Sequence, residues 1–235
     1  MKLFRRHAVP GDANEIAAQV AMRPEGFATT IVSAVALVLS AYSLWETSLK
    51  QADLDVYVTD TVSYARDVSG GFNVRQAGGY EVLAIPVTIA NSGARDGAVL
   101  SLHLDAQNPA NGQAVRFESS YTADATYFAA VDDPSTGAKR PKMPFAPLVI
   151  AGRSAWSGTI LFYVPDYNAQ KLITSKGKIE ATLNARTPRP SGWFDQLLGG
   201  GEAAPVTLTF DVPEISTTYL VTGEFARLRS ASANP

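Results

Sequence analysis

A run of twenty uncharged residues, 26–45, constrains the fold of this chain more than any other feature. At about 1.5 Å per residue, a helix of this length matches the ~30 Å hydrocarbon core of a bilayer. Arg23 and Glu46 bracket the run closely, and Tyr42 and Trp45 stand at its exit, where aromatic rings favour the membrane interface. The run predicts one transmembrane helix with the boundaries 26–47.

The segment before this helix predicts its orientation. A cleaved signal peptide has an apolar region of about 7–15 residues behind a short leader, whereas here 25 residues precede a longer run, so we expect the helix to be retained. Four basic residues precede the helix and only Lys50 follows it within twenty residues, which favours a cytoplasmic N-terminus. We expect a cytoplasmic leader over 1–25 with a short amphipathic helix, and an extracytoplasmic domain over 48–235. In a Gram-negative source this is a single-pass inner-membrane protein with a periplasmic domain.

Charge and cysteine content narrow the function of the exterior domain. The chain has a net charge of −2 and no block of basic residues, which disfavours electrostatic binding to nucleic acid. It contains no cysteine, which excludes thiol redox chemistry, cysteine nucleophiles and cysteine metal sites. The lack of cysteine identifies no compartment, because an oxidising environment permits disulfides without requiring them.

After the helix, apolar and polar residues alternate in several segments, as is typical of strands with one buried and one solvent-exposed face. Helical periodicity between the segments is weak, which disfavours a parallel α/β sheet. About seven to nine short strands separated by Gly, Pro and Asn predict an all-β, antiparallel, immunoglobulin-like sandwich. The segments are 54–58, 82–90, 98–104, 114–121, 156–164, 178–185, 206–212 and 216–225. In 98–104 the alternation predicts one shared face for Ala98, Leu100, Leu102 and Leu104.

Three connections join these segments in a characteristic order. The triplet 91–93 (NSG) ends one strand, 95–97 (RDG) precedes the next, and 150–154 (IAGRS) leads into a third. Asn and Gly tolerate left-handed backbone conformations, which we expect such a reversal to need. Over about residues 80–165 this order resembles the immunoglobulin-like adhesion-type and LEA-like sandwich modules of bacterial envelope proteins. The resemblance implies no enzymatic activity, and it implies structural roles for Asn91, Gly93 and Gly152.

Residues with catalytic or metal-binding chemistry are sparse. The histidines are His7, in the leader, and His103, on the polar face of its predicted strand, where we expect a surface residue. Asp53 and Asp55 lack the spacing of a calcium loop, and no phosphate-binding glycine pattern occurs. We therefore expect no enzyme activity, metal or cofactor. Four aromatic residues would form either a carbohydrate platform or, as we expect, part of the core: Tyr121, Tyr127, Phe128 and Phe145.

Two long loops are candidates for contact with a partner, since long loops are often functional. The loop 130–147 contains charged residues and four prolines, and it reads either as a solvated crossover or as a partner-facing loop. The loop 186–205 has a predicted helical turn capped by Ser191 and ended by three glycines. Its apolar residues would either close one end of the sandwich or dock on a partner or the membrane surface: Trp193, Phe194, Leu197 and Leu198.

The predicted transmembrane helix has two different faces. Small and hydroxyl residues recur at alternating intervals of three and four, which places them on one side of a helix. A small face lets helices approach closely in lipid, although a run this rich in small residues would produce such a face partly by chance. This small-residue face comprises Gly26, Thr29, Ser33, Ala36, Ser40, Ser43 and Thr47.

These features favour a non-catalytic accessory or scaffolding subunit of an envelope membrane complex. Its helix would pack through the small-residue face, and its domain through the long loops. The partners would be other integral membrane proteins, or a second copy of the chain, within the lipid bilayer. The alternative is a periplasmic module for adhesion or for binding a glycan or peptide.

Overall fold

The computed structural model describes residues 24–67, 79–129, 141–165, 172, 177–188, 203–212 and 226–230. The chain separates into two compact units, Met1–Leu49 and Lys50–Pro235, and each is described on its own. Residues 1–23 of the predicted leader lie outside the described residues, so its amphipathic helix stays a prediction.

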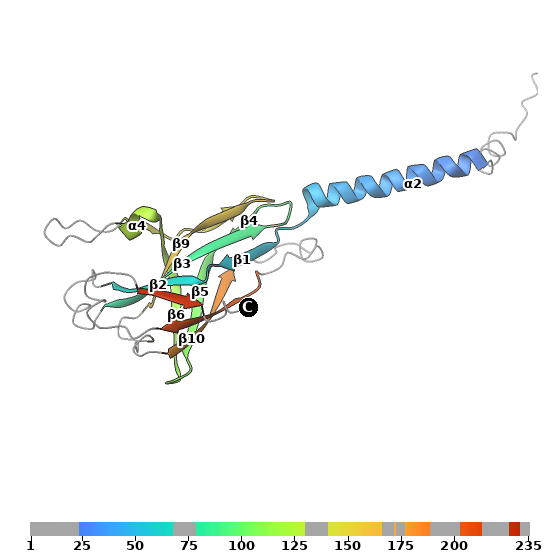
Figure 1. The fold of residues 1–235 in the computed structure, drawn as a ribbon. Coiled ribbons are helices and arrows are strands. Elements are labelled where there is room, and N and C mark those ends of the chain that lie inside the picture. The colour runs from blue at the N-terminus through green and yellow to red at the C-terminus, as the bar shows by residue number, and fades with distance from the viewer. Residues whose placement is uncertain are drawn as a thin grey trace, which may run out of the picture. The chain divides into compact units, whose positions relative to one another are not determined.

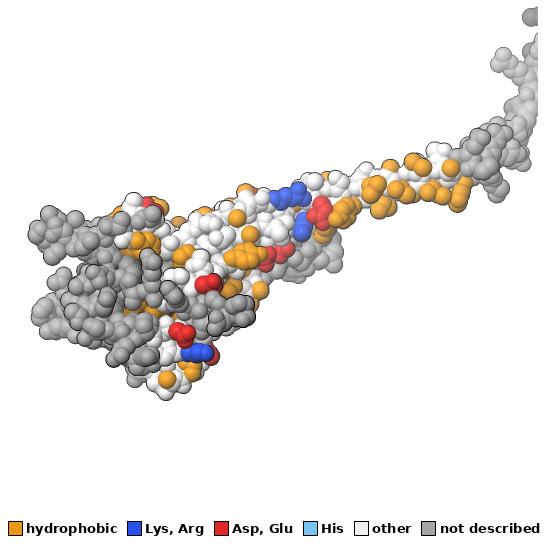
Figure 2. All heavy atoms as spheres, in the orientation of Figure 1, with side chains coloured by type: hydrophobic (Ala, Val, Ile, Leu, Met, Phe, Trp, Pro, Cys, Tyr) orange, Lys and Arg blue, Asp and Glu red, His pale blue; other side chains and the backbone are white. Residues whose placement is uncertain are grey.

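The described part of the first unit is helical. Helix α2 (Pro24–Leu44) continues into a π-helical turn, η1 (Trp45–Leu49). The stretch Phe27–Leu49 is long and apolar enough to cross a membrane, and none of its most apolar part is buried inside the chain. Figure 2 shows hydrophobic side chains along one flank of this helix and few along the other. The prediction of one N-terminal apolar helix of membrane-spanning length is confirmed, whereas its orientation stays a prediction.

In its described residues the second unit is built from strands and one short helix, α4 (Ala125–Ala129) (Figure 1). The alternating segments of the sequence account for most of the strands. In chain order the strands are β1 (Leu54–Val58), β2 (Thr61–Asp67), β3 (Tyr80–Asn91), β4 (Gly97–Val99), β5 (Ser101–Asn108), β6 (Gln113–Ala123), β7 (Met143–Pro144), β8 (Leu148–Ile150), β9 (Ala155–Tyr163), β10 (Gly177–Arg186), β11 (Val206–Val212) and β12 (Ala226–Ser230).

Backbone pairing closes eight of these strands into a ring. The order β3-β2-β12-β11-β10-β5-β6-β9 returns to β3, because β9 pairs with both β6 and β3. Each of these pairings is antiparallel. Outside the ring, β1 pairs with the second half of β3, β7 pairs with the end of β6, and β4 pairs with β8. The domain is therefore close to a closed β-barrel.

The all-β, antiparallel prediction is confirmed, whereas the immunoglobulin-like or LEA-like arrangement is not. In a sandwich the two sheets keep separate edges, but here β9 hydrogen-bonds on both sides and joins what would be two edges. Alternation of apolar residues shows which side chains face inward. It does not show which strands are neighbours, so the double pairing of β9 could not be read from the sequence.

One apolar cluster fills the interior of the ring. Its largest fully buried side chains include Tyr64, Phe117, Phe162 and Phe210, and burying an aliphatic or Phe side chain contributes about 1.5–3 kcal/mol. The alternation predicted for 178–185 is confirmed, because the inward residues Ile179, Ala181 and Leu183 are buried and the outward ones are exposed or half-buried. The fourth inward residue, Ala185, is half-buried against the core. The core is thus formed by the period-two pattern that the sequence displays.

The described strands differ from the local predictions in two places. Val99, not Ala98 or Leu100, is buried, because β4 pairs with β8 and the chain shifts register before β5 begins. At this break the Leu100 amide donates to the Arg186 carbonyl. The strands β2 and β12 were not predicted, although Val62 and Tyr64 of β2 and Leu228 of β12 are fully buried. The predicted strand 216–225 lies outside the described residues.

Candidate functional sites

The small-residue face of the helix is exposed along its described length. Helix α2 includes Gly26, and the five predicted side chains after it are exposed: Thr29, Ser33, Ala36, Ser40 and Ser43. Two hydroxyls bond within the helix. Ser40 Oγ donates to the Ala36 carbonyl, and Thr47 Oγ1 donates to the Ser43 carbonyl, both at 2.7 Å. These donors are satisfied without a second helix, so the face can enter lipid at low cost.

A second candidate site is the end of the barrel where the chain enters it. We call it the entry rim, and it comprises residues 50–53, 91–96 and 149–154. At its centre, Asn91 is 2% exposed. The Asn91 Oδ1 atom accepts from the amides of Asp53 and Gly93, at 3.1 and 3.0 Å. Its Nδ2 donates to the carbonyls of Arg95, Ile150 and Ala151. One side chain therefore holds all three segments of the entry rim together.

Glycines allow the backbones of the entry rim to touch. A Cβ on Gly93 would overlap the Gln51 carbonyl oxygen, and one on Gly152 would overlap the Ala94 carbonyl oxygen. The structural roles of both glycines, implied by the family resemblance, fit this geometry. The expected reason was wrong, because neither glycine has a positive φ and the left-handed residue of this region is Arg153, at φ 56°. Close approach of backbones, not left-handed geometry, requires glycine here.

A third candidate is a cluster of charged and aromatic side chains on the outer wall of the barrel. Lys142 Nζ lies 3.0 Å from Asp67 Oδ2 and 2.7 Å from the Tyr163 hydroxyl, which itself donates to Asp67 at 2.8 Å. The ammonium also lies 4.2 Å from the centre of the Tyr121 ring, a cation–π contact. Burial, and next the Asp67 carboxylate, raise the pKa of Tyr163 far above its ordinary value of 10.0. Tyr163 therefore stays a neutral hydrogen-bond donor.

The aromatic residues predicted to be a platform or core lie mostly in packed positions. Tyr121 packs edge-on against Tyr163, and Tyr127 is 6% exposed. Phe145 packs against the main core, whereas Phe128 is 41% exposed. Asp124 orders the short helix α4 by accepting from the Thr126 hydroxyl and amide, which lowers the pKa of Asp124. The predicted core packing is confirmed for Tyr121, Tyr127 and Phe145.

A buried carboxylate forms a fourth cluster, which the sequence did not reveal. Glu81 is 3% exposed. It accepts from the Tyr64 hydroxyl and from the Leu172 amide, each at 2.9 Å, and the Leu172 carbonyl accepts from Asn108 Nδ2. Burial, and next the charge of Glu81, raise the pKa of Tyr64 well above 10.0. Glu81 and Asn108 therefore fix Leu172 in the core, which is a structural role.

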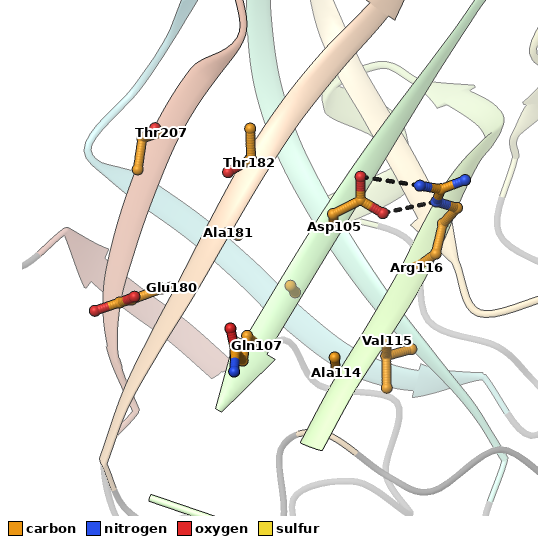
Figure 3. A pocket seen from close by; sticks show the side chains of 10 residues that line it. Asp105, Gln107, Ala114, Val115, Arg116, Glu180, Ala181, Thr182 and Thr207 are labelled. Carbon is orange, nitrogen blue, oxygen red and sulfur yellow. Dashed lines mark hydrogen bonds and ion pairs between the residues drawn. The ribbon is translucent and has the colours of Figure 1, made fainter. Parts of the chain in front are cut away.

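The outer face of β5, β6, β10 and β11 carries a shallow polar groove of about 650 Å³ (Figure 3). Across it, Arg116 Nε lies 2.6 Å from Asp105 Oδ1, and the carboxylate raises the pKa of Arg116. His103 Nε2 lies 3.7 Å from Asp105 and is partly exposed, in agreement with the predicted surface position. In the described part of the chain no three His, Asp or Glu side chains are grouped to hold a metal.

The predicted contact residues Trp193, Phe194, Leu197 and Leu198 lie outside the described residues. The loop 130–147 is described only from residue 141 onward, where Lys142 belongs to the outer-wall cluster and Met143 is 70% exposed. Both loops therefore stay predicted partner contacts.

Comparisons with known proteins place the chain in no family. No family model matches it, and no curated protein matches it. Among solved structures, a Bordetella pertussis protein described as ApaA is 17% identical, with 78% of this chain and 98% of that protein covered and a TM-score of 0.26. A family 123 glycoside hydrolase from Clostridium perfringens is 13% identical, with 70% of this chain and 28% of the hydrolase covered and a TM-score of 0.34. Similarity at this level carries no conclusion about function.

Proposed function

We propose that the protein is a single-pass, non-catalytic accessory or scaffolding subunit of an envelope membrane complex. Phe27–Leu49 spans the inner membrane, with the N-terminus in the cytoplasm and the β-domain in the periplasm. The partner is another integral membrane protein or a second copy of this chain. The basic residues before the helix support this orientation, since cytoplasmic flanks carry the excess of Lys and Arg.

The exposed, two-sided helix carries this proposal. Its apolar residues are not covered by the chain itself, so lipid or another helix must cover them. Val35 and Val38 lie on the bulky side, 52% and 66% exposed, whereas Ser33, Ala36 and Ser40 present almost no side-chain volume on the other side. Lipid chains solvate the bulky side well. The small side gains more from a partner helix, because close backbone approach increases dispersion contacts.

The hydroxyl geometry favours packing over polar contacts as the source of affinity. Ser40 and Thr47 already donate to carbonyls four residues earlier in the helix. Their protons are therefore not available to a neighbouring helix without loss of these bonds. Shape complementarity along Ser33, Ala36 and Ser40 becomes the main contribution, and added side-chain volume should disrupt it.

The test introduces volume on one face at a time. The variant Ser33→Leu/Ala36→Leu/Ser40→Leu keeps the helix apolar and fills the small-residue face, while Val35→Leu/Val38→Leu adds volume on the bulky face as a matched control. Each chain is extracted in mild detergent, and its partners are identified by pull-down, mass spectrometry and native size. We expect the triple variant to lose its partner and the control to retain it. A wild-type chain recovered alone and monomeric would refute the subunit proposal, and a triple variant that still assembles would refute the role of this face.

The domain contributes a second contact in this proposal. The apolar residues Trp193, Phe194, Leu197 and Leu198 of the loop 186–205 dock on the periplasmic part of the partner. The strand and turn order over 80–165 supports a relationship to the immunoglobulin-like and LEA-like envelope modules. Ala substitution of Trp193 and Phe194 should weaken the pull-down without releasing the chain from the membrane.

The groove on the outer wall favours a second candidate function, binding of a periplasmic glycan or peptide. Gln107, Thr182 and Thr207 line it together with the Asp105–Arg116 ion pair, and these groups offer both donors and acceptors. Binding of envelope glycan fragments to the wild-type chain in detergent, abolished by Arg116→Ala, would favour this function. Retention of binding in that variant would argue against the groove.

A further inference from the structure

The entry rim fixes the residue that directly follows the apolar span. The Lys50 carbonyl accepts from the amides of Ala94 and Arg95, at 3.0 and 3.2 Å. The Arg153 amide donates to the Gly93 carbonyl at 2.9 Å. The backbone at Lys50 is therefore part of the folded domain, and no free linker separates it from the loops 91–96 and 149–154.

Covalent connectivity then places this rim beside a bilayer surface. The apolar span ends at Leu49, and Lys50 is the next residue. If the span crosses a membrane, as the proposed function states, the lipid headgroups lie within a few residues' reach of the entry rim. The close backbone contacts at Gly93 and Gly152 leave little room for the rim to rearrange.

The side chains of the entry rim suit a lipid interface. Val149 is 73% exposed, although valine is normally found inside proteins. The basic residues of the rim are Lys50, Arg95 and Arg153. Its acids are Asp53, which accepts from the Ser92 hydroxyl at 2.7 Å, and Asp96, which accepts from the Gly152 amide at 3.1 Å. Both carboxylates are exposed and keep their charge, so three basic residues against two acidic ones leave the rim with one positive charge in excess.

We propose that the entry rim lies on anionic phospholipid headgroups. Arg95 and Arg153 donate to phosphate oxygens, for which the guanidinium group has matching geometry, Lys50 adds a point charge, and Val149 enters the interfacial layer. The inference rests on the membrane span of the proposed function and deepens it, because a rim held on the headgroups would orient the whole β-domain toward its partner.

A fluorescence experiment on the full chain tests this contact. The chain has no cysteine, so a single one can carry an environment-sensitive fluorophore. Ala151→Cys labels the entry rim, and Ala110→Cys is the matched control, since both alanines are exposed. Ala110 lies in the β5–β6 turn at the opposite end of the barrel: Ala90 pairs with Ala155 at the rim, whereas Tyr163 pairs with Glu118 and β6 runs on to Gln113. The chain is reconstituted in phosphatidylcholine vesicles, with or without phosphatidylglycerol, containing a lipid with a nitroxide on its headgroup.

We expect quenching at position 151 and little at position 110. Quenching at 151 should increase with phosphatidylglycerol and decrease with salt. The change Arg95→Gln/Arg153→Gln should lower the equilibrium constant for contact between the rim and the headgroups roughly thirtyfold. Each basic residue near an anionic surface raises this constant about fivefold, and the variant removes two of them. Equal, weak quenching at both positions would refute the inference.

Flotation of the vesicles in alkaline carbonate separates this inference from the proposed function. A chain that floats while position 151 stays unquenched refutes the rim contact alone. A chain that does not float refutes the membrane span, and the rim contact with it. If quenching at 151 does not change with phosphatidylglycerol or with salt, the assignment to anionic headgroups is refuted.

Discussion

Asn91 offers the sharpest test of how the domain is held together. The change Asn91→Ala removes an amide that accepts from two backbone N–H groups and donates to three backbone carbonyls. A buried donor left without a partner costs about 1–3 kcal/mol, and a typical hydrogen bond contributes about 1 kcal/mol net. The two N–H protons of Nδ2 are shared among three carbonyls, so these contacts do not each contribute a full hydrogen bond. We therefore expect the free energy of unfolding to fall by about 3–5 kcal/mol. That is a large part of the roughly 5–15 kcal/mol that stabilises a typical domain.

Urea unfolding of the full chain in detergent micelles measures this loss. The helix stays in the micelle while the β-domain unfolds, and the fluorescence of Trp156, which packs against the core, reports the transition together with far-UV circular dichroism. Asn184→Ala is the matched control, because Asn184 Nδ2 makes two 3.3 Å contacts at a half-buried position on the outer wall. We expect the control to cost less than about 1 kcal/mol.

The variant Asn91→Asp separates the two halves of the amide. It keeps the acceptor for the amides of Asp53 and Gly93 but places a carboxylate without a donor against three carbonyl oxygens, so it should destabilise about as much as Asn91→Ala. A loss below about 1 kcal/mol for Asn91→Ala, with an unchanged urea slope, would refute the conclusion that this residue holds the entry rim. A wild-type-like Asn91→Asp would show that the donor half contributes nothing.

Three further predictions concern the clusters inside and outside the barrel. The raised pKa values of Tyr64 and Tyr163 mean that their stabilising contribution is complete below pH 10 and is lost as the pH rises through 10, where the unfolded tyrosines ionise. The free energy of unfolding should therefore fall by up to about 2.7 kcal/mol per pH unit, and Tyr64→Phe should reduce this slope by about half; an equal slope in the variant would contradict the assignment. Glu81→Gln should lower the free energy of unfolding by about 1–3 kcal/mol. Tyr64 donates to Oε1 and Leu172 to Oε2, and Gln replaces one of these two oxygens with an NH2 group that cannot accept. An unchanged urea midpoint would argue against this cluster. Lys142→Met should destabilise by about 1–2 kcal/mol by leaving the partly buried Asp67 carboxylate without its cation, while Lys178→Met on an outward position of β10 should change the midpoint by less than about 0.5 kcal/mol.

The alternation of apolar and polar residues was sufficient to predict most strands, but not to predict how the strands pair or which side chains from distant strands meet. The alternation in 178–185 and 206–212 predicted β10 and β11 with the correct buried faces, because a strand's period of two is a local property. The alternation wrongly placed Leu100 on the buried face. The break between β4 and β5 lies at this residue, and it reverses which side chains point inward. The outer-wall cluster joins Asp67, Lys142 and Tyr163, which are far apart in the chain, so no spacing in the sequence could have indicated it.

The sequence by itself determined the properties that depend on neighbouring residues: one uncharged run long enough to span a bilayer, its small and bulky faces, and the antiparallel β character of the segments after it. The tertiary structure alone decided which strands pair, and hence that β9 closes a ring. It also decided why Asn91, Gly93 and Gly152 stand where they do. The sequence marked them as turn residues with left-handed geometry, whereas the structure shows three backbones packed in contact around one buried amide. Hydrogen bonding and close packing between distant segments are properties of the folded chain, and a local pattern does not encode them.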